Sequence, residues 1–190
     1  MSKSLAEALE EAFERCRRMD ASVSERLQAL ADAVQHLSAP FADTVDRLIL
    51  RLQRSDAGAT APQPGDPMPS FLLPDEQGHL VALEDLLDQG PVAITFHRGH
   101  WCPYCRINTD ALAKAQKEIA AEGGQVVAVM PDRQQFAAKF KSELQAPFPI
   151  LTDLDNGYAL SLNLAISIEP WLSSTFCMRP DASARSKRLP

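Results

Sequence analysis

The sequence has few cysteines and no long apolar run. Its 190 residues include four cysteines, too few for a secreted domain held together by disulfides. The longest apolar runs, around 92–96 and 126–130, fall well short of the roughly 20 residues that cross a bilayer. The first 13 residues lack the apolar run of a secretory signal. We therefore expect a cytoplasmic protein, in a compartment where close cysteine pairs are redox-active or metal-binding more often than structural.

An excess of basic residues is also missing. The chain has 19 Lys and Arg against 25 Asp and Glu, for a net charge of −6. This balance argues against a general nucleic-acid-binding surface, although it is compatible with a local basic patch. Hydrophobic residues make up 45% and charged residues 23% of the chain, which is typical of a folded globular protein. The length predicts one domain with an extension.

Residues 1–54 are predicted to form a helical extension. Apolar residues recur at helical spacing in three runs, 5–19, 27–37 and 45–52. Two Ser-x-x-Glu segments, at 4–7 and 22–25, have the spacing of capping boxes. Cys16 lies on the first apolar stripe and is expected to be buried and inert. A helical extension of this kind favours a homodimer.

A linker separates this extension from an α/β domain. Residues 55–70 contain four prolines and two glycines, which oppose regular structure. We expect the domain at 71–178 and a basic tail at 179–190. The domain pattern predicts a hairpin around Gln77 and Gly78, followed by these elements: a strand at 91–96, a helix at 107–121, a strand at 125–130, a helix at 136–144, a strand at 148–151 and a helix at 156–164. Strand, helix and strand form a right-handed parallel β-α-β unit.

The densest chemical signal is the segment 96–105, which reads FHRGHWCPYC. It lies where a buried strand ends and the crossover helix begins, the usual place for sites in α/β sheets. If Cys102 precedes the helix and Pro103 occupies its first position, the Cys102 sulfur faces unpaired amides and the positive end of the helix dipole. Both lower its pKa. Cys105, one turn later, is close enough to form a disulfide with it. We predict that Cys102 attacks and Cys105 resolves.

The neighbouring residues are predicted to support this chemistry. Arg98 can stabilise an anionic sulfur or hydrogen-bond an attacked oxygen. Gly99 lets the backbone bend into the site, and Trp101 either packs beside the sulfur or contacts substrate. Pro103 and Tyr104 are the remaining site-shaping residues. No cofactor is expected.

Two other interpretations of the segment 96–105 remain open, a zinc site and a pair of inert cysteines. His97, His100, Cys102 and Cys105 are four possible zinc ligands. They crowd into nine residues, whereas structural zinc sites usually join two separated ligand pairs, so no metal is predicted. The second alternative is a pair of inert buried cysteines. The two histidines are expected to be polar residues near the mouth of the site, because nothing in the sequence fixes their partners.

The segment resembles the Phe-x-Arg-Gly-x-Trp-Cys-Pro-x-Cys pattern of the peroxiredoxin-like branch of the alkyl hydroperoxide reductase/thiol-specific antioxidant family. The stretches 65–83 and 149–156 are also similar to this family, and the resemblance covers roughly residues 60–170. It implies a thioredoxin-like α/β fold with a central mixed sheet flanked by helices. It also implies reduction of small peroxides or disulfides, with Cys102 at the peroxidatic position and an external dithiol as reductant.

The sequence departs from the family pattern at several positions. Thr95 and Gly99 stand where typical peroxiredoxins have a proline and a threonine, and Ser173, in a predicted strand at 172–176, stands where the fold has a cis-proline. A short basic tail replaces a further strand and helix, so an incomplete sheet edge is expected. Cys177 is expected to be a strand or edge residue, with an accessory thiol as the alternative. These departures suggest a second hypothesis, a catalytically weakened thioredoxin-fold protein that serves as an interaction module.

Overall fold

Two compact units make up the described chain. The computed structural model describes residues 4–168. The first unit combines residues 4–55 with 101–107 and 167–168, and the second combines 56–100 with 108–166. Helix α5 (Pro103–Ala121) therefore has its first turns in the first unit and the rest in the second. The predicted strand at 172–176, Cys177 and the basic tail lie outside the described residues.

The helices of the extension form as expected. They are α1 (Leu5–Arg17), α2 (Val23–Leu37) and α3 (Ala39–Arg54). Ser4 and Ser22 each accept the amide of the glutamate three residues later, and each glutamate carboxylate binds back to its serine. Both predicted capping boxes are thus confirmed, and they satisfy amides at the starts of α1 and α2 that would otherwise lack partners.

The apolar stripes of these helices form the core of the first unit, and α1 packs against α2. Cys16 is buried at 3% exposure, as predicted, and burial raises the pKa of its thiol. The Nε of Arg26, itself buried, donates to the Cys16 carbonyl oxygen at 3.2 Å. A cation at this place satisfies a carbonyl at the C-terminal end of α1. Leu5 and Met19, at the two ends of the predicted stripe, are exposed.

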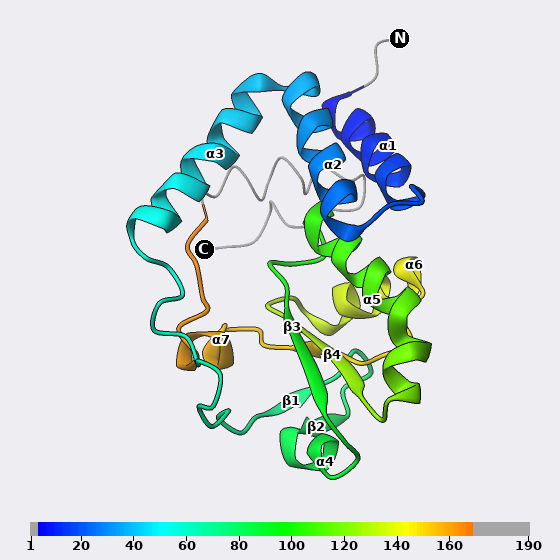
Figure 1. Cartoon of the computed structure of the whole chain (residues 1–190), viewed down its shortest axis with the longest axis vertical. Coiled ribbons are helices and arrows are strands. Elements are labelled where there is room, and N and C mark those ends of the chain that lie inside the picture. Colours follow the sequence, from blue (N-terminus) through cyan, green and yellow to red (C-terminus); the bar gives the residue numbers. More distant parts are fainter. Residues whose placement is uncertain (1–3, 169–190) are drawn as a thin grey trace, which may run out of the picture. The chain divides into compact units, whose positions relative to one another are not determined.

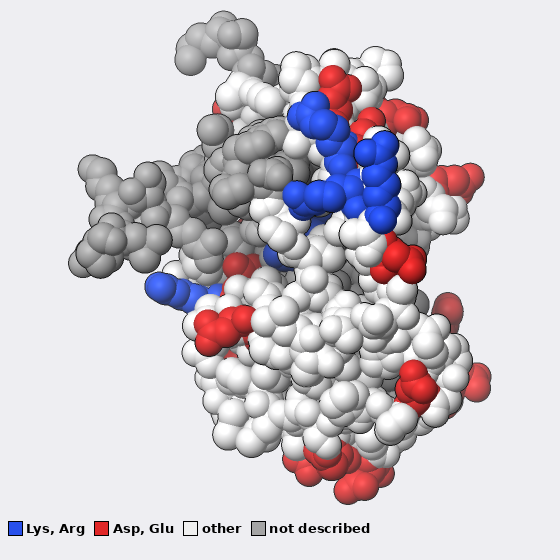
Figure 2. All heavy atoms as spheres, turned by 90° about the vertical axis from the view of Figure 1, so that its left-hand side faces the viewer, with Lys and Arg blue, Asp and Glu red and all other residues white. Residues whose placement is uncertain are grey.

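The exposed face of α3 carries a local basic patch. Arg47, Arg51 and Arg54 line a shallow hollow together with Leu50 and Ser55. Figure 2 shows Lys and Arg side chains gathered on this side of the first unit. Arg51 and Arg54 lie in the last turn of α3, where positive charge offsets the helix dipole. The whole chain therefore has a net negative charge, but this small part of its surface is basic.

The strands of the second unit confirm the predicted pairing. A hairpin joins β1 (Leu72–Pro74) to β2 (Leu80–Ala82) in antiparallel register. The main sheet has the order β3-β4-β5, from β3 (Val92–Phe96), β4 (Gln125–Met130) and β5 (Ile150–Thr152). Both of its pairings are parallel, and α5 connects β3 to β4 (Figure 1).

The remaining helices differ from the predictions mainly in their ends. Helix α6 (Gln134–Leu144) begins two residues before the predicted start, and α7 (Gly157–Ser161) is shorter than predicted. Helix α5 begins at Pro103, four residues before the predicted apolar run. Helix α4 (Leu83–Leu87) was not predicted, because its five residues are too few to show a period. Among residues 4–168, no helix has the length and hydropathy needed to cross a bilayer.

The middle strand of the sheet, β4, is buried on both faces. Its side chains alternate between the faces, and residues from Val126 to Met130 are all buried. On one face Val127 and Val129 belong to a core cluster that also contains Phe71, Leu83, Leu86, Leu151, Tyr158 and Leu162. Because β3 and β4 are parallel, their carboxyl ends lie at the same edge of the sheet. The segments that follow Phe96 and Met130 therefore leave the sheet side by side.

Candidate functional site

Cys102 lies directly before the first residue of α5, at the start of the crossover helix. Its Sγ accepts a hydrogen bond from the Cys105 amide at 3.4 Å, and its carbonyl oxygen accepts the Arg106 amide at 3.1 Å. Cys102 is 1% exposed and Cys105 is 9% exposed, so both cysteines are buried. The sulfur thus occupies the place of a helix-capping oxygen, where backbone amides and the helix dipole favour negative charge.

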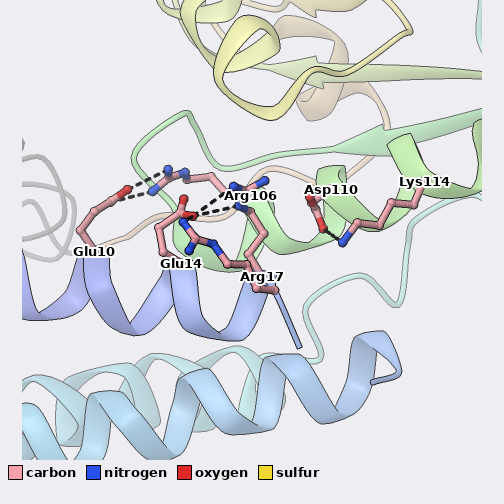
Figure 3. Close-up of polar contacts among 7 residues, drawn as sticks. Glu10, Glu14, Arg17, Arg106, Asp110 and Lys114 are labelled. Atoms are coloured by element: carbon pink, nitrogen blue, oxygen red, sulfur yellow. Dashed lines mark hydrogen bonds and ion pairs between the residues drawn. The ribbon is translucent and has the colours of Figure 1, made fainter. Parts of the chain in front are cut away.

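The residue after Cys105 ties the dithiol helix to the N-terminal extension. Arg106 is buried, and its Nη1 and Nη2 donate to the two carboxylate oxygens of Glu10 at 2.8 and 2.9 Å (Figure 3). Its guanidinium carbon lies 3.7 Å from the centroid of the Phe13 ring. This two-pronged ion pair and cation–π contact connect α1 to the first turn of α5. Neither Glu10 nor Phe13 was predicted from the sequence as a partner of Arg106.

The predicted site-shaping residues lie on either side of the helix start. Gly99 is buried and has a φ of +142°, a conformation that favours glycine over residues with a Cβ. Arg98 is half-buried in the bend after β3, and Trp101 and Tyr104 are also half-buried. Pro103 is buried as the first residue of α5. The roles assigned to these residues stay predictions.

His97 is a core residue, so the expectation that it lies near the mouth of the site is wrong. It is 5% exposed, with Nε2 at 3.0 Å from the Thr95 hydroxyl and Nδ1 at 3.3 Å from the Thr109 hydroxyl. The ring of Phe140 meets it edge-on. Burial lowers the pKa of His97 to about 4. The imidazole is therefore neutral at neutral pH, and hydroxyl groups contact both of its nitrogens.

His100 has a partner that the sequence did not reveal. The Asp132 Oδ2 lies 2.7 Å from the His100 amide nitrogen, which donates to it, and 3.0 Å from the ring Nδ1. The imidazole stacks on Phe136, with centroids 4.6 Å apart and ring planes 8° apart. Asp132 follows β4 and His100 follows β3, so both come from the same edge of the sheet. An acidic residue just after a buried strand was the available signal for Asp132.

The geometry argues against the zinc alternative. Both ring nitrogens of His97 are occupied by threonine hydroxyls, and the Nδ1 of His100 faces Asp132. Within the described residues, no three Cys, His, Asp or Glu side chains are grouped so that they could hold a metal ion.

Known proteins similar to this chain include a thiol-disulfide oxidoreductase and a peroxiredoxin. Thiol-disulfide oxidoreductase ResA of Bacillus subtilis is 29% identical over 126 residues, covering 66% of this chain and 66% of that protein. Peroxiredoxin Bcp of Escherichia coli is 28% identical over 92 residues, covering 48% of this chain and 58% of that protein. The matches thus span about three-fifths to two-thirds of the length of these relatives.

A solved structure and a family model extend the comparison. The crystal structure of peroxidoxin BcpB from Mycobacterium tuberculosis is 27% identical, with a TM-score of 0.53 over 55% of this chain and 68% of that chain. This likeness agrees with the predicted thioredoxin-like α/β fold. The model of the AhpC/TSA family matches residues 64–182, more than half of the sequence, and the chain therefore belongs to the AhpC/TSA family.

Proposed function

We propose that the chain is a peroxiredoxin-like thiol oxidoreductase that reduces peroxides or disulfides through Cys102 and Cys105. The observation that carries the proposal is the hydrogen bond from the Cys105 amide to the Cys102 sulfur at the start of α5. It supports Cys102 as the thiolate, because the thiolate is the nucleophilic form of cysteine and a helix start favours it. Membership of the AhpC/TSA family supports the same chemistry.

The reaction runs in two steps for a peroxide. The Cys102 thiolate attacks one peroxide oxygen, so that the S–O bond forms while the O–O bond breaks, and the departing oxygen takes up a proton to leave as alcohol or water. Cys102 is now a sulfenic acid, oxidised by two electrons. The Cys105 sulfur then attacks the Cys102 sulfur, which forms the disulfide and releases hydroxide that leaves as water with the Cys105 proton. An external dithiol restores the two thiols by exchange.

The burial of Cys102 and Cys105 affects which oxidants can reach the Cys102 sulfur. Cys102 is 1% exposed and Cys105 is 9% exposed, so a compact peroxide meets less steric hindrance at Cys102 than a disulfide within a folded protein does. In this proposal Arg98 stabilises the anionic sulfur or the attacked oxygen. Function through a reducible disulfide also fits the cytoplasmic location expected from the sequence.

Alkylation followed by mass spectrometry tests the proposal. After one equivalent of hydrogen peroxide, the peptide that contains Cys102 and Cys105 should lose two hydrogen atoms and resist alkylation, and a dithiol should reverse both changes. Cys105→Ser should instead retain a sulfenic acid or mixed disulfide on Cys102. Cys16→Ser is the matched control and should behave as the wild type. A Cys102 that stays reduced for many minutes would refute the proposal and favour the interaction module.

A further inference from the structure

The first turn of α5, which carries both cysteines of the dithiol, packs with the N-terminal extension. Residues 101–107 belong to the same compact unit as residues 4–55, whereas the rest of α5 belongs to the second unit. Within this turn the Cys105 amide donates to the Cys102 sulfur at 3.4 Å, and both cysteines are buried. The extension is therefore part of the surroundings that a reagent must pass to reach Cys102.

Three side chains hold this turn against α1, and we call them the Arg106 clamp: Glu10, Phe13 and Arg106. Nη1 and Nη2 of Arg106 donate to the two Glu10 carboxylate oxygens at 2.8 and 2.9 Å, a contact drawn with dashed lines in Figure 3. The guanidinium carbon lies 3.7 Å from the centroid of the Phe13 ring. Phe13 is 1% exposed and the Arg106 side chain is 6% exposed. The clamp thus joins α1 to the turn that carries the dithiol.

Glu10 is the member of the clamp that solvent can reach. Its side chain is 39% exposed, so dissolved ions screen it from one side. The Nε of Arg106 is buried and has no hydrogen-bond partner in the part of the chain that the structure describes. A buried guanidinium that loses its carboxylate is unfavourable. Weakening the contact with Glu10 therefore favours separation of α1 from the turn, because separation lets water bind the guanidinium.

This separation matters more to large reagents than to small ones. Hydrogen peroxide is scarcely larger than water, so small fluctuations of the closed structure are enough to admit it. A bulky reagent reacts only while α1 and the turn are apart, so its rate is proportional to the population of that opened state. Loss of a charged, partly exposed contact should raise this population about 10-fold, which corresponds to about 1.4 kcal/mol.

We propose, on the basis of the proposed function, that the Arg106 clamp determines substrate size and selects compact hydroperoxides over bulky ones. The clamp residues touch no reacting atom, and the reaction is the same for either substrate. The Cys102 thiolate attacks one peroxide oxygen, so that the S–O bond forms as the O–O bond breaks. The departing oxygen takes up a proton from solvent and leaves as water or as an alcohol.

Single-turnover oxidation of the full chain by two hydroperoxides tests this proposal. Oxidation of Cys102 by hydrogen peroxide and by cumene hydroperoxide would be timed by rapid quenching and mass spectrometry. Glu10→Gln should raise the rate with cumene hydroperoxide about 10-fold and change the rate with hydrogen peroxide less than about threefold. Glu14→Gln is the matched control, because Glu14 also lies on α1 but pairs with Arg17, and it should match the wild type with both oxidants.

High salt provides a second measurement that needs no variant. At about 1 M NaCl the Debye length falls to about 3 Å, so salt should raise the wild-type rate with cumene hydroperoxide and have less effect on Glu10→Gln. Equal acceleration of both oxidants in Glu10→Gln would overturn the inference, because α1 would then not select by size. An unchanged rate with cumene hydroperoxide in that variant would overturn it as well.

Alkylation distinguishes failure of this inference from failure of the proposed function. Iodoacetamide is larger than hydrogen peroxide and needs no redox reaction, so it should alkylate native Cys102 about 10-fold faster in Glu10→Gln than in the wild type. A wild-type chain that neither hydroperoxide oxidises would refute the proposed function, and the alkylation rates would still report on the clamp. Equal alkylation of the two proteins would show that the clamp does not control access to Cys102.

Discussion

The ion pair between Glu10 and Arg106 should contribute to stability in a way that can be measured by mutation. Replacing Glu10 with Gln removes the charge opposite a guanidinium whose side chain is 6% exposed. Both hydrogen bonds from Arg106 lose their charged acceptor. A buried cation left without its counter-ion is costly, so Glu10→Gln should destabilise the chain.

The expected magnitude follows from the exposure of the two partners. Breaking a fully buried ion pair costs about 3–5 kcal/mol, and a hydrogen bond to a charged group contributes about 1.5–3 kcal/mol. The Glu10 side chain is 39% exposed, so water screens the pair and lowers its contribution. We expect Glu10→Gln to lower the free energy of unfolding by about 1–2 kcal/mol.

A double-mutant cycle isolates this contribution from other effects of the substitutions. Urea unfolding would be measured for the wild type, Glu10→Gln, Arg106→Met and the double variant, because methionine retains apolar contact with Phe13. The coupling energy should be about 1–2 kcal/mol. Glu14→Gln is the control, since Glu14 pairs with the more exposed Arg17 at 3.0 Å and should cost less than about 0.5 kcal/mol.

The same variant should expose the dithiol. Both cysteines are buried, so alkylation of the native protein requires local opening of the first turn of α5. A loss of 1–2 kcal/mol in that turn predicts native-state alkylation about 5- to 30-fold faster in Glu10→Gln. A coupling energy below about 0.3 kcal/mol, together with an unchanged alkylation rate, would show that α1 does not hold the helix start.

Three further outcomes are expected. Because burial lowers the pKa of His97 to about 4, the unfolded chain takes up its proton first as pH falls below about 6.5, and stability is lost between about 6.5 and 4. Urea unfolding at pH 7 and 4.5 should show a loss of about 2–3 kcal/mol in the wild type relative to His97→Gln, and parallel losses would contradict this. Burial raises the pKa of the Cys16 thiol, so native-state iodoacetamide should label Cys16 more slowly than Cys102, and the reverse order would be inconsistent with it. Size-exclusion chromatography with light scattering should give the mass of a homodimer, and a monomer at all concentrations would refute that expectation.

Local patterns in the sequence were sufficient to predict most of the fold. Capping boxes at Ser4 and Ser22 are encoded within four residues, and continuous apolar runs such as 126–130 identify strands that are buried on both faces. The position of Cys102 before Pro103 follows from the helix preference for proline in its first turn. Short elements such as α4 lack enough residues to show a period, so they escaped prediction.

The tertiary partners of the site were not predictable from the same patterns. Glu10 and Arg106 are 96 residues apart, and each taken alone reads as an ordinary surface charge on a helix. Asp132 and His100 are 32 residues apart, and they meet only because β3 and β4 are parallel neighbours. His97 seemed equivalent to His100 in the sequence, but His97 lies in the core between the Thr95 and Thr109 hydroxyls, whereas His100 faces Asp132.

Steady-state peroxide consumption tests the central claim most directly. The full chain would be supplied with hydrogen peroxide and an excess of dithiothreitol, and consumption would be compared between the wild type, Cys102→Ser and Cys16→Ser. The wild type and Cys16→Ser should consume many equivalents of peroxide per protein, and Cys102→Ser should show only the background reaction of the dithiol. Equal consumption by the wild type and Cys102→Ser would contradict the assignment of Cys102 as the attacking sulfur.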